Sequence, residues 1–213
     1  MKKENIILSI LLILFSIITI LVLTNKTKDI DMYVYNLIHS FSSDKLTSFF
    51  KGITRLGNSK FCVILVLGFL LLLRNLKGLF PLIASIDVEI INLVLKFIFK
   101  RPRPNIIHLV HVSNYSYPSG HAMISVGIYG CFIYMIMKYI KNKKLKILSV
   151  SLLSILILLI GMSRIYLGVH YFTDIVAGYI ISCCYLIIFA KVVRKWGNID
   201  ERVNSKWFWW YFN

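Results

Sequence analysis

The stretch "SRIYLGVHYFTD", residues 163–174, lies where two long apolar segments meet, and yet it carries Arg164, His170 and Asp174. Ionisable side chains are costly in the hydrocarbon core of a bilayer, and those that occur there commonly belong to functional sites. Each flanking segment is close to the length of a membrane-spanning helix. The stretch therefore predicts a turn between two membrane helices that presents polar chemistry at the membrane surface.

The composition of the chain indicates the solvent in which it folds. Of its 213 residues, 58% are hydrophobic, and the mean hydropathy of +0.74 exceeds what a soluble domain of this size can bury. The formal net charge is +16, but the basic residues lie in short connectors between apolar runs. We therefore expect an integral membrane protein whose basic connectors face anionic lipid headgroups and not nucleic acid.

Six apolar runs approach the roughly 20 residues that a helix needs to cross a bilayer. They span residues 5–23, 58–74, 79–99, 119–138, 146–162 and 172–191. No small-residue cleavage site follows the first run, so we interpret it as an uncleaved anchor. Because the sequence has no internal repeat, it predicts one all-α domain over residues 1–213, a bundle of six transmembrane helices with its motifs between residues 96 and 174.

The distribution of basic residues predicts the orientation in the membrane. With six helices both termini lie on one side, and that side would hold 14 of the 25 Lys and Arg residues. By the positive-inside rule we expect a multi-pass protein of the plasma membrane with cytoplasmic termini. The outer side would then hold the connectors 24–57, 100–118 and 163–171.

Three polar segments meet on that outer side. "KFIFKRPRP", residues 96–104, ends the third run, "PSGH", residues 118–121, opens the fourth, and the stretch at 163–174 links the fifth to the sixth. Taken alone, each has a structural explanation: a snorkelling lysine, a proline and serine at a helix start, or a self-satisfied His–Asp pair. Their convergence at one membrane depth favours a shared functional site.

The converging residue types suit a bound phosphate group. Lys96, Arg103 and Arg164 would neutralise its oxygens, the arginines through paired N–H groups. Backbone N–H groups around Ser119 and Gly120 would point at the anion from the start of the fourth helix. These five residues are the predicted phosphate-binding set, with Gly120 allowing the backbone to approach closely.

The two histidines divide the chemistry between them. Asp174 can accept the ring N–H of His170 one helical turn away, so that the other ring nitrogen faces phosphorus as a nucleophile. His121 can give a proton to the departing oxygen and later activate water. Neither a metal ion nor a cofactor is expected, because fixed cations supply the charge stabilisation that phosphoryl transfer needs.

These segments resemble the type 2 phosphatidic acid phosphatase superfamily, which is marked by the motifs K-x6-RP, PSGH and SR-x5-H-x3-D. The motif positions in this chain are Lys96, Arg103, Pro104, Pro118, Ser119, Gly120, His121, Ser163, Arg164, His170 and Asp174. The resemblance covers residues from about 50 to 190. It implies a six-helix fold, a phosphohistidine intermediate on His170, and metal-independent hydrolysis of lipid phosphates or diphosphates.

The expected substrate is a lipid whose phosphate lies at the headgroup plane. An outward-facing site favours undecaprenyl diphosphate, which would be hydrolysed to undecaprenyl phosphate. Phosphatidylglycerophosphate, phosphatidic acid and diacylglycerol pyrophosphate are alternatives, because nothing in the sequence selects among lipid tails. Two hypotheses from other classes are a lipid transporter or scramblase, which usually has repeated halves and broken helices, and a haem-carrying bundle, which would pair histidines at two depths.

Three further features carry secondary predictions. Asp87 and Glu89, inside the third run, are interpreted as members of a hydrogen-bond network, with substrate positioning as the alternative. Residues 31–53 have apolar residues at helical spacing and predict an amphipathic helix on the outer surface. The tail "WFWWYFN", residues 207–213, predicts an aromatic anchor at the membrane interface.

Overall fold

The computed structural model describes the backbone of residues 2–73 and 79–203, with side chains for residues 2–68 and 79–195, and every regular element in these ranges is a helix. The helices are α1 (Lys2–Leu23), α2 (Lys28–His39), α3 (Asp44–Arg55), α4 (Ser59–Leu73), α5 (Leu79–Phe99), α6 (Gly120–Tyr139), α7 (Lys143–Tyr166) and α8 (Phe172–Val203).

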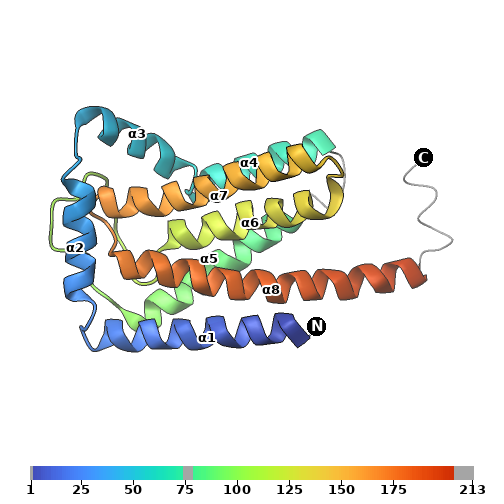
Figure 1. The fold of residues 1–213 in the computed structure, drawn as a ribbon, viewed down its shortest axis with the longest axis horizontal. Helices are drawn as coiled ribbons and strands as arrows, with labels where there is room; N and C mark the ends of the chain where they lie inside the picture. Colours follow the sequence, from blue (N-terminus) through green and yellow to red (C-terminus); the bar gives the residue numbers. More distant parts are fainter. Residues whose placement is uncertain (1, 74–78, 204–213) are drawn as a thin grey trace.

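Helix α6 forms the centre of the bundle. It contacts α5, α7 and α8, and α1 packs along α8. In Figure 1, α1, α6, α7 and α8 run with their axes nearly aligned. The N-terminal half of α6 is buried, including Met123 and Ile128. Both α6 and α7 begin at side-chain caps: Ser119 accepts from the amide of Ala122, and Asn142 accepts from that of Leu145.

Each of the six predicted apolar runs coincides with one helix, namely α1 or α4 to α8. Within the described ranges, four helices are long and apolar enough to cross a membrane: α1, α6, α7 and α8 between Phe172 and Lys195. Helix α4 has only 15 described residues, and α5 carries Asp87, Glu89 and Lys96. The chain is therefore an all-helical, multi-pass membrane protein, while the number of six spans stays a prediction.

The region before α4 differs from its prediction. Residues 31–53 are predicted to form an amphipathic surface helix, but the structure divides them between α2 and α3. Figure 1 shows α2 lying across one end of the bundle, and α3 contacts α7. The rings of Phe50 and Tyr166 lie 4.7 Å apart between centroids and join these two helices. The physical reason for the break is that Ser43 caps a new helix by accepting from the amide of Leu46. Asp31 of α2 then binds Arg101, and Thr54 of α3 binds Arg164.

The acidic residues of α5 have hydrogen-bond partners on neighbouring helices. The hydroxyl of Tyr185 donates to Asp87 at 2.7 Å, and that of Ser59 donates to Glu89 at 2.9 Å. Such contacts satisfy polar groups that lipid cannot solvate. This arrangement agrees with the interpretation of both carboxylates as members of a hydrogen-bond network.

Both described ends of the chain lie at one end of the bundle. Figure 1 shows the start of α1 and the far end of α8 on the side opposite α2 and the connector between α7 and α8. This agrees with the expectation that the termini share one side, although which side faces the cytoplasm stays a prediction. The aromatic tail, residues 207–213, lies outside the described residues.

Candidate active site

Three segments distant in sequence meet at the end of the bundle that α2 covers. They are the end of α5, the start of α6 and the turn between α7 and α8. The connector 100–118 packs against that turn, where the amide of Leu109 donates to the carbonyl of Leu167 at 3.1 Å. Gly168 has a φ of +74°, and a β-carbon there would lie 2.5 Å from the carbonyl oxygen of Ile107. The turn therefore requires glycine for both its backbone and its contact.

His170 is buried, with its two ring nitrogens in different surroundings. Its Nδ1 lies 3.2 Å from Oδ2 of Asp174, and its Nε2 lies 3.3 Å from Nη1 of Arg103. Burial lowers the pKa of His170 to about 3, because the Asp174 carboxylate opposes this only in part and Arg164 and Arg103 add to it. The ring is therefore neutral near pH 7, and with a proton on Nδ1 its Nε2 is the acceptor that faces Nη1 of Arg103.

Asp174 is inaccessible to solvent and accepts hydrogen bonds on both oxygens. Nη1 of Arg101 donates to Oδ1 at 2.6 Å. Oδ2 accepts from the amide of Tyr171 at 3.0 Å and from the hydroxyl of Ser116, in addition to facing His170. Because these donors come from the connector and the turn, the carboxylate is held in one orientation.

The three predicted cations lie around this pair. Arg103 donates from Nη1 to the carbonyl of Val169 at 2.7 Å, which keeps its guanidinium beside His170. Nη1 of the buried Arg164 donates to Thr54 at 2.8 Å, whereas its Nε has no hydrogen-bond partner in the described part of the chain. Lys96, 8% exposed, is within electrostatic range of Arg103 and Arg164. Cations gathered this closely favour an anion between them.

His121, at the start of α6, belongs to the same cluster. Its ring is within electrostatic range of His170, Lys96, Arg103 and Arg164. A histidine on α6 and a histidine before α8 therefore border one cationic region from two sides. The structure brings all of the predicted site residues to one end of the bundle.

The amide of Ser119 already has an acceptor within the protein, and the role of Ser119 in phosphate binding stays a prediction. Its amide donates to the carbonyl of Asp174 at 3.1 Å, so it is not free for an anion, and its hydroxyl caps α6. The first amides of the helix itself, those of Gly120 and His121, are the ones that a helix start leaves without intrahelical acceptors. A β-carbon on Gly120 would lie 2.9 Å from Oδ1 of Asn92, so glycine is also needed for the packing of α5 against α6.

Sequence reasoning missed four residues that hold the site together. They are Asp31, Thr54, Arg101 and Ser116. One signal was available, because Asp31 is in helical phase with Val34, Tyr35 and Ile38, which pack against the core. An acid on the buried face of an amphipathic helix indicates a buried partner.

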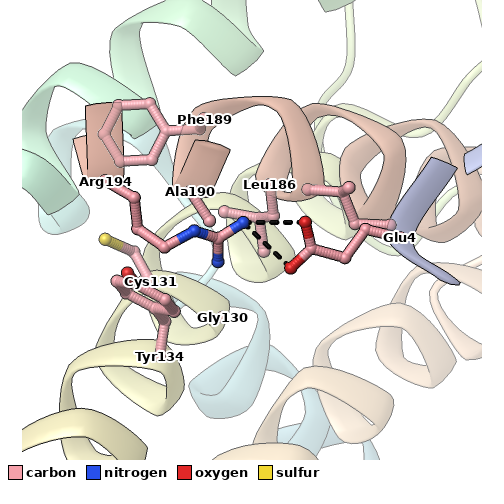
Figure 2. A pocket seen from close by; sticks show the side chains of 9 residues that line it. Glu4, Gly130, Cys131, Tyr134, Leu186, Phe189, Ala190 and Arg194 are labelled. Carbon is pink, nitrogen blue, oxygen red and sulfur yellow. Dashed lines mark hydrogen bonds and ion pairs between the residues drawn. The ribbon is translucent and has the colours of Figure 1, made fainter. Parts of the chain in front are cut away.

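A cavity of about 220 Å³ lies at the other end of the bundle, between α1, α6 and α8. Figure 2 shows Arg194 beside it, paired with Glu4 at 2.8 Å. Its lining is mostly apolar, with Leu186 and Phe189 among its members and no histidine in the described lining. Its described lining therefore lacks the histidines of the predicted reaction, and the cationic cluster is the candidate site.

Known proteins match this chain over most of its length. The model of the PAP2 superfamily matches residues 77–198. Phosphatidylglycerophosphatase B of Bacillus subtilis (strain 168) is 30% identical over 201 residues, covering 91% of this chain and 94% of the relative. Sphingosine-1-phosphate phosphatase 1 of Rattus norvegicus is 29% identical over 153 residues, covering 70% of this chain and 35% of the relative.

Two solved structures share the fold. The crystal structure of the first transmembrane PAP2 type phosphatidylglycerolphosphate phosphatase from Bacillus subtilis has a TM-score of 0.81 at 28% identity, covering 88% of this chain and 96% of its own. That of Aquifex aeolicus LpxE has a TM-score of 0.58 at 27% identity, covering 75% and 94%. With the cluster described above, these matches lead to one conclusion: the chain belongs to the PAP2 superfamily and is a membrane lipid phosphatase that hydrolyses phosphoester bonds.

Proposed function

We propose that this phosphatase removes the terminal phosphate of phosphatidylglycerophosphate through a phosphohistidine on His170, without a metal ion. The observation that carries the proposal is the environment of the His170 ring, with Nδ1 on Asp174 and Nε2 beside Arg103. A neutral imidazole oriented in this way points its lone pair at the region where Arg103 and Arg164 would hold a phosphate.

In the first half of the reaction, Nε2 of His170 forms a bond to phosphorus while the bond from phosphorus to the lipid oxygen breaks. His121 starts this step as the imidazolium and donates a proton to that oxygen, so the lipid leaves as an alcohol and His121 becomes neutral. Asp174 accepts the hydrogen bond from Nδ1 and stabilises the positive charge that develops on the ring. The cations Lys96, Arg103 and Arg164 stabilise the phosphoryl oxygens.

In the second half, His121 takes a proton from a water molecule as that water attacks phosphorus. The bond between phosphorus and Nε2 of His170 breaks, and inorganic phosphate is released. The ring of His170 regains its lone pair, and the proton on Nδ1 remains with the ring throughout. Both histidines therefore return to their starting states after one turnover.

The choice of lipid is supported by the relatives. The name of the Bacillus subtilis relative states that it acts on phosphatidylglycerophosphate, and the similarity to this chain extends over 94% of its length. Undecaprenyl diphosphate, the substrate that the outward orientation favours, stays a prediction. The same residues would release phosphate from it, with the lipid monophosphate as the leaving group.

A panel of purified lipids tests this proposal. The protein in detergent micelles is incubated with phosphatidylglycerophosphate, phosphatidic acid and undecaprenyl diphosphate, and released phosphate is measured with His170→Ala as the blank. We expect the highest kcat/KM on phosphatidylglycerophosphate. A preference of tenfold or more for undecaprenyl diphosphate would reassign the substrate, and no release from any lipid would overturn the proposed reaction.

A further inference from the structure

The guanidinium of Arg101 lies between two buried carboxylates. Its Nη1 donates to Oδ1 of Asp174 at 2.6 Å, and its Nη2 donates to Oδ2 of Asp31 at 2.8 Å. The side chain of Arg101 is 11% exposed, and both carboxylates are fully buried. The ring of Tyr171 covers the guanidinium at 3.9 Å from its centroid. Solvent therefore screens these ion pairs weakly.

Like Asp174, Asp31 accepts hydrogen bonds on both carboxylate oxygens. Its Oδ1 accepts from the amide of Thr173 at 2.9 Å, and its Oδ2 accepts from the Thr173 hydroxyl at 2.9 Å. These bonds join α2 to the first turn of α8, one residue before Asp174. The first turn of α8 thus contains Asp174, which faces His170. It also contains Thr173, which binds Asp31.

The hydrogen bonds divide the two oxygens of Asp174 between different tasks. Arg101 occupies Oδ1, which leaves Oδ2 for Nδ1 of His170, the Ser116 hydroxyl and the amide of Tyr171. A planar guanidinium bound at both ends resists rotation, and a carboxylate bonded to it resists rotation as well. The negative charge of Asp31 also offsets part of the positive electrostatic potential that Arg101 produces at Asp174.

We infer that Arg101 and Asp31 are positioning residues for the phosphatase reaction, an inference that rests on the function proposed above. Asp31 fixes Arg101, and Arg101 fixes the plane of the Asp174 carboxylate against the nucleophile His170. The contacts of Asp31 and Arg101 run through Asp174, on the Nδ1 edge of the ring, whereas Arg103 marks the Nε2 edge where phosphate would bind. Helix α2 thereby contributes a positioning residue, Asp31, to the site.

Steady-state kinetics of four variants test this inference. Asp31→Asn keeps an acceptor for the Thr173 amide but removes the charge that holds Arg101, and we expect kcat to fall about tenfold with KM unchanged. Arg101→Gln should lower kcat about 100-fold, and Arg101→Lys should fall between it and the wild type because it keeps the charge but not the fork. Asp29→Asn, an exposed acid in the same turn of α2, is the matched control and should equal the wild type.

The double variant Asp31→Asn with Arg101→Gln separates positioning from general structural damage. Because Asp31 acts through Arg101, adding Asp31→Asn to Arg101→Gln should change kcat less than twofold. Vanadate should inhibit all the variants at the wild-type concentration, since the anion site is intact. Multiplicative effects on kcat, or a rise in KM and weaker vanadate inhibition without a fall in kcat, would overturn the inference.

Two outcomes distinguish this inference from the proposed function. If wild-type protein releases no phosphate from any lipid of the panel, the proposed function fails. If the wild type is active and Asp31→Asn equals Asp29→Asn, only the positioning inference fails. Should Arg101→Gln not fold, Arg101→Lys carries the same test, because an unchanged kcat in that variant contradicts the need for the fork.

Discussion

Nη1 of Arg103 lies 3.3 Å from Nε2 of His170. The other nitrogen of the same ring faces Asp174, so one edge of the imidazole meets a cation and the other meets an anion. A phosphate drawn to Arg103 would therefore arrive in front of the Nε2 lone pair. Nucleophilic attack by Nε2, as proposed above, would therefore need no rotation of the ring.

Removal of the nucleophile should abolish turnover. His170→Ala is expected to lower kcat by about four orders of magnitude, and Asp174→Ala by about three, because the two residues act as a unit. Phosphate release from phosphatidylglycerophosphate measures the effect. His111→Ala, at an exposed position of the connector 100–118, should keep wild-type activity. More than a tenth of the wild-type rate in His170→Ala would exclude His170 as the nucleophile.

Fixed cations should make the reaction independent of divalent metals and sensitive to vanadate. We expect full activity in excess chelator, because Lys96, Arg103 and Arg164 supply the charge that a metal would otherwise provide. Vanadate should inhibit competitively by occupying the same cationic region. A strict requirement for a divalent ion, or indifference to millimolar vanadate, would contradict this assignment of the anion site.

Activity should depend on the forked shape of the Arg164 guanidinium and not only on its positive charge. Nη1 donates to Thr54 at 2.8 Å, and the buried Nε has no hydrogen-bond partner in the described part of the chain. Arg164→Lys keeps the charge but not the fork, and kcat/KM should fall about 100-fold. Arg55→Lys, at an exposed arginine of α3, is the matched control. Equal effects of the two substitutions would argue against direct contact with phosphate.

The low pKa of His170 should make stability depend on pH. The folded state keeps the ring neutral down to about pH 3, whereas the unfolded chain binds a proton below its ordinary pKa of about 6.5. The free energy of unfolding therefore does not depend on this group above pH 6.5. Below that pH it decreases, by about 2 kcal/mol at pH 5. Unfolding in detergent at pH 7.5 and pH 5 measures it. His170→Gln should lose correspondingly less stability, and an equal loss in both proteins would refute the shift.

The turn between α7 and α8 should not tolerate a side chain at residue 168. Gly168→Ala would place a β-carbon 2.5 Å from the carbonyl oxygen of Ile107 at a φ of +74°, and we expect a loss of about 1–3 kcal/mol. Gly52→Ala, in α3 with nothing within 4 Å of the added carbon, should instead be neutral or stabilising by up to about 1 kcal/mol. Thermal unfolding compares the two. An unaffected Gly168→Ala protein would show that the turn can rearrange.

Much of this architecture is predictable because membrane helices and PAP2 motifs leave local patterns. Apolar runs of fixed length predict α1 and α4 to α8. Connectors alternate between the two sides of the membrane, and the two connectors next to the motif segments lie on the same side. Lys96, His121 and His170 are therefore predicted to lie together. The amide of Ser119 shows the limit of this reasoning, because its acceptor is the Asp174 carbonyl, 55 positions further along the chain.

The contacts that hold the site depend on how α2 and α3 fold back over the bundle. Asp31 and Thr173 are 142 positions apart, and Thr54 and Arg164 are 110 apart. Asp31, Thr54 and Thr173 are also ordinary residues for an exposed connector, so composition does not mark them. Only the helical phase of Asp31 with apolar neighbours hints that it is buried.

The bond between the Ser119 amide and the Asp174 carbonyl also has a mechanical consequence. A β-carbon on Gly178 would lie only 3.0 Å from the Ser119 carbonyl oxygen, so the start of α6 is pressed directly against α8. The segments that carry His121 and His170 are thus fixed directly to each other. We therefore expect the distance between the imidazoles of His121 and His170 to stay constant when a lipid enters between the outer helices.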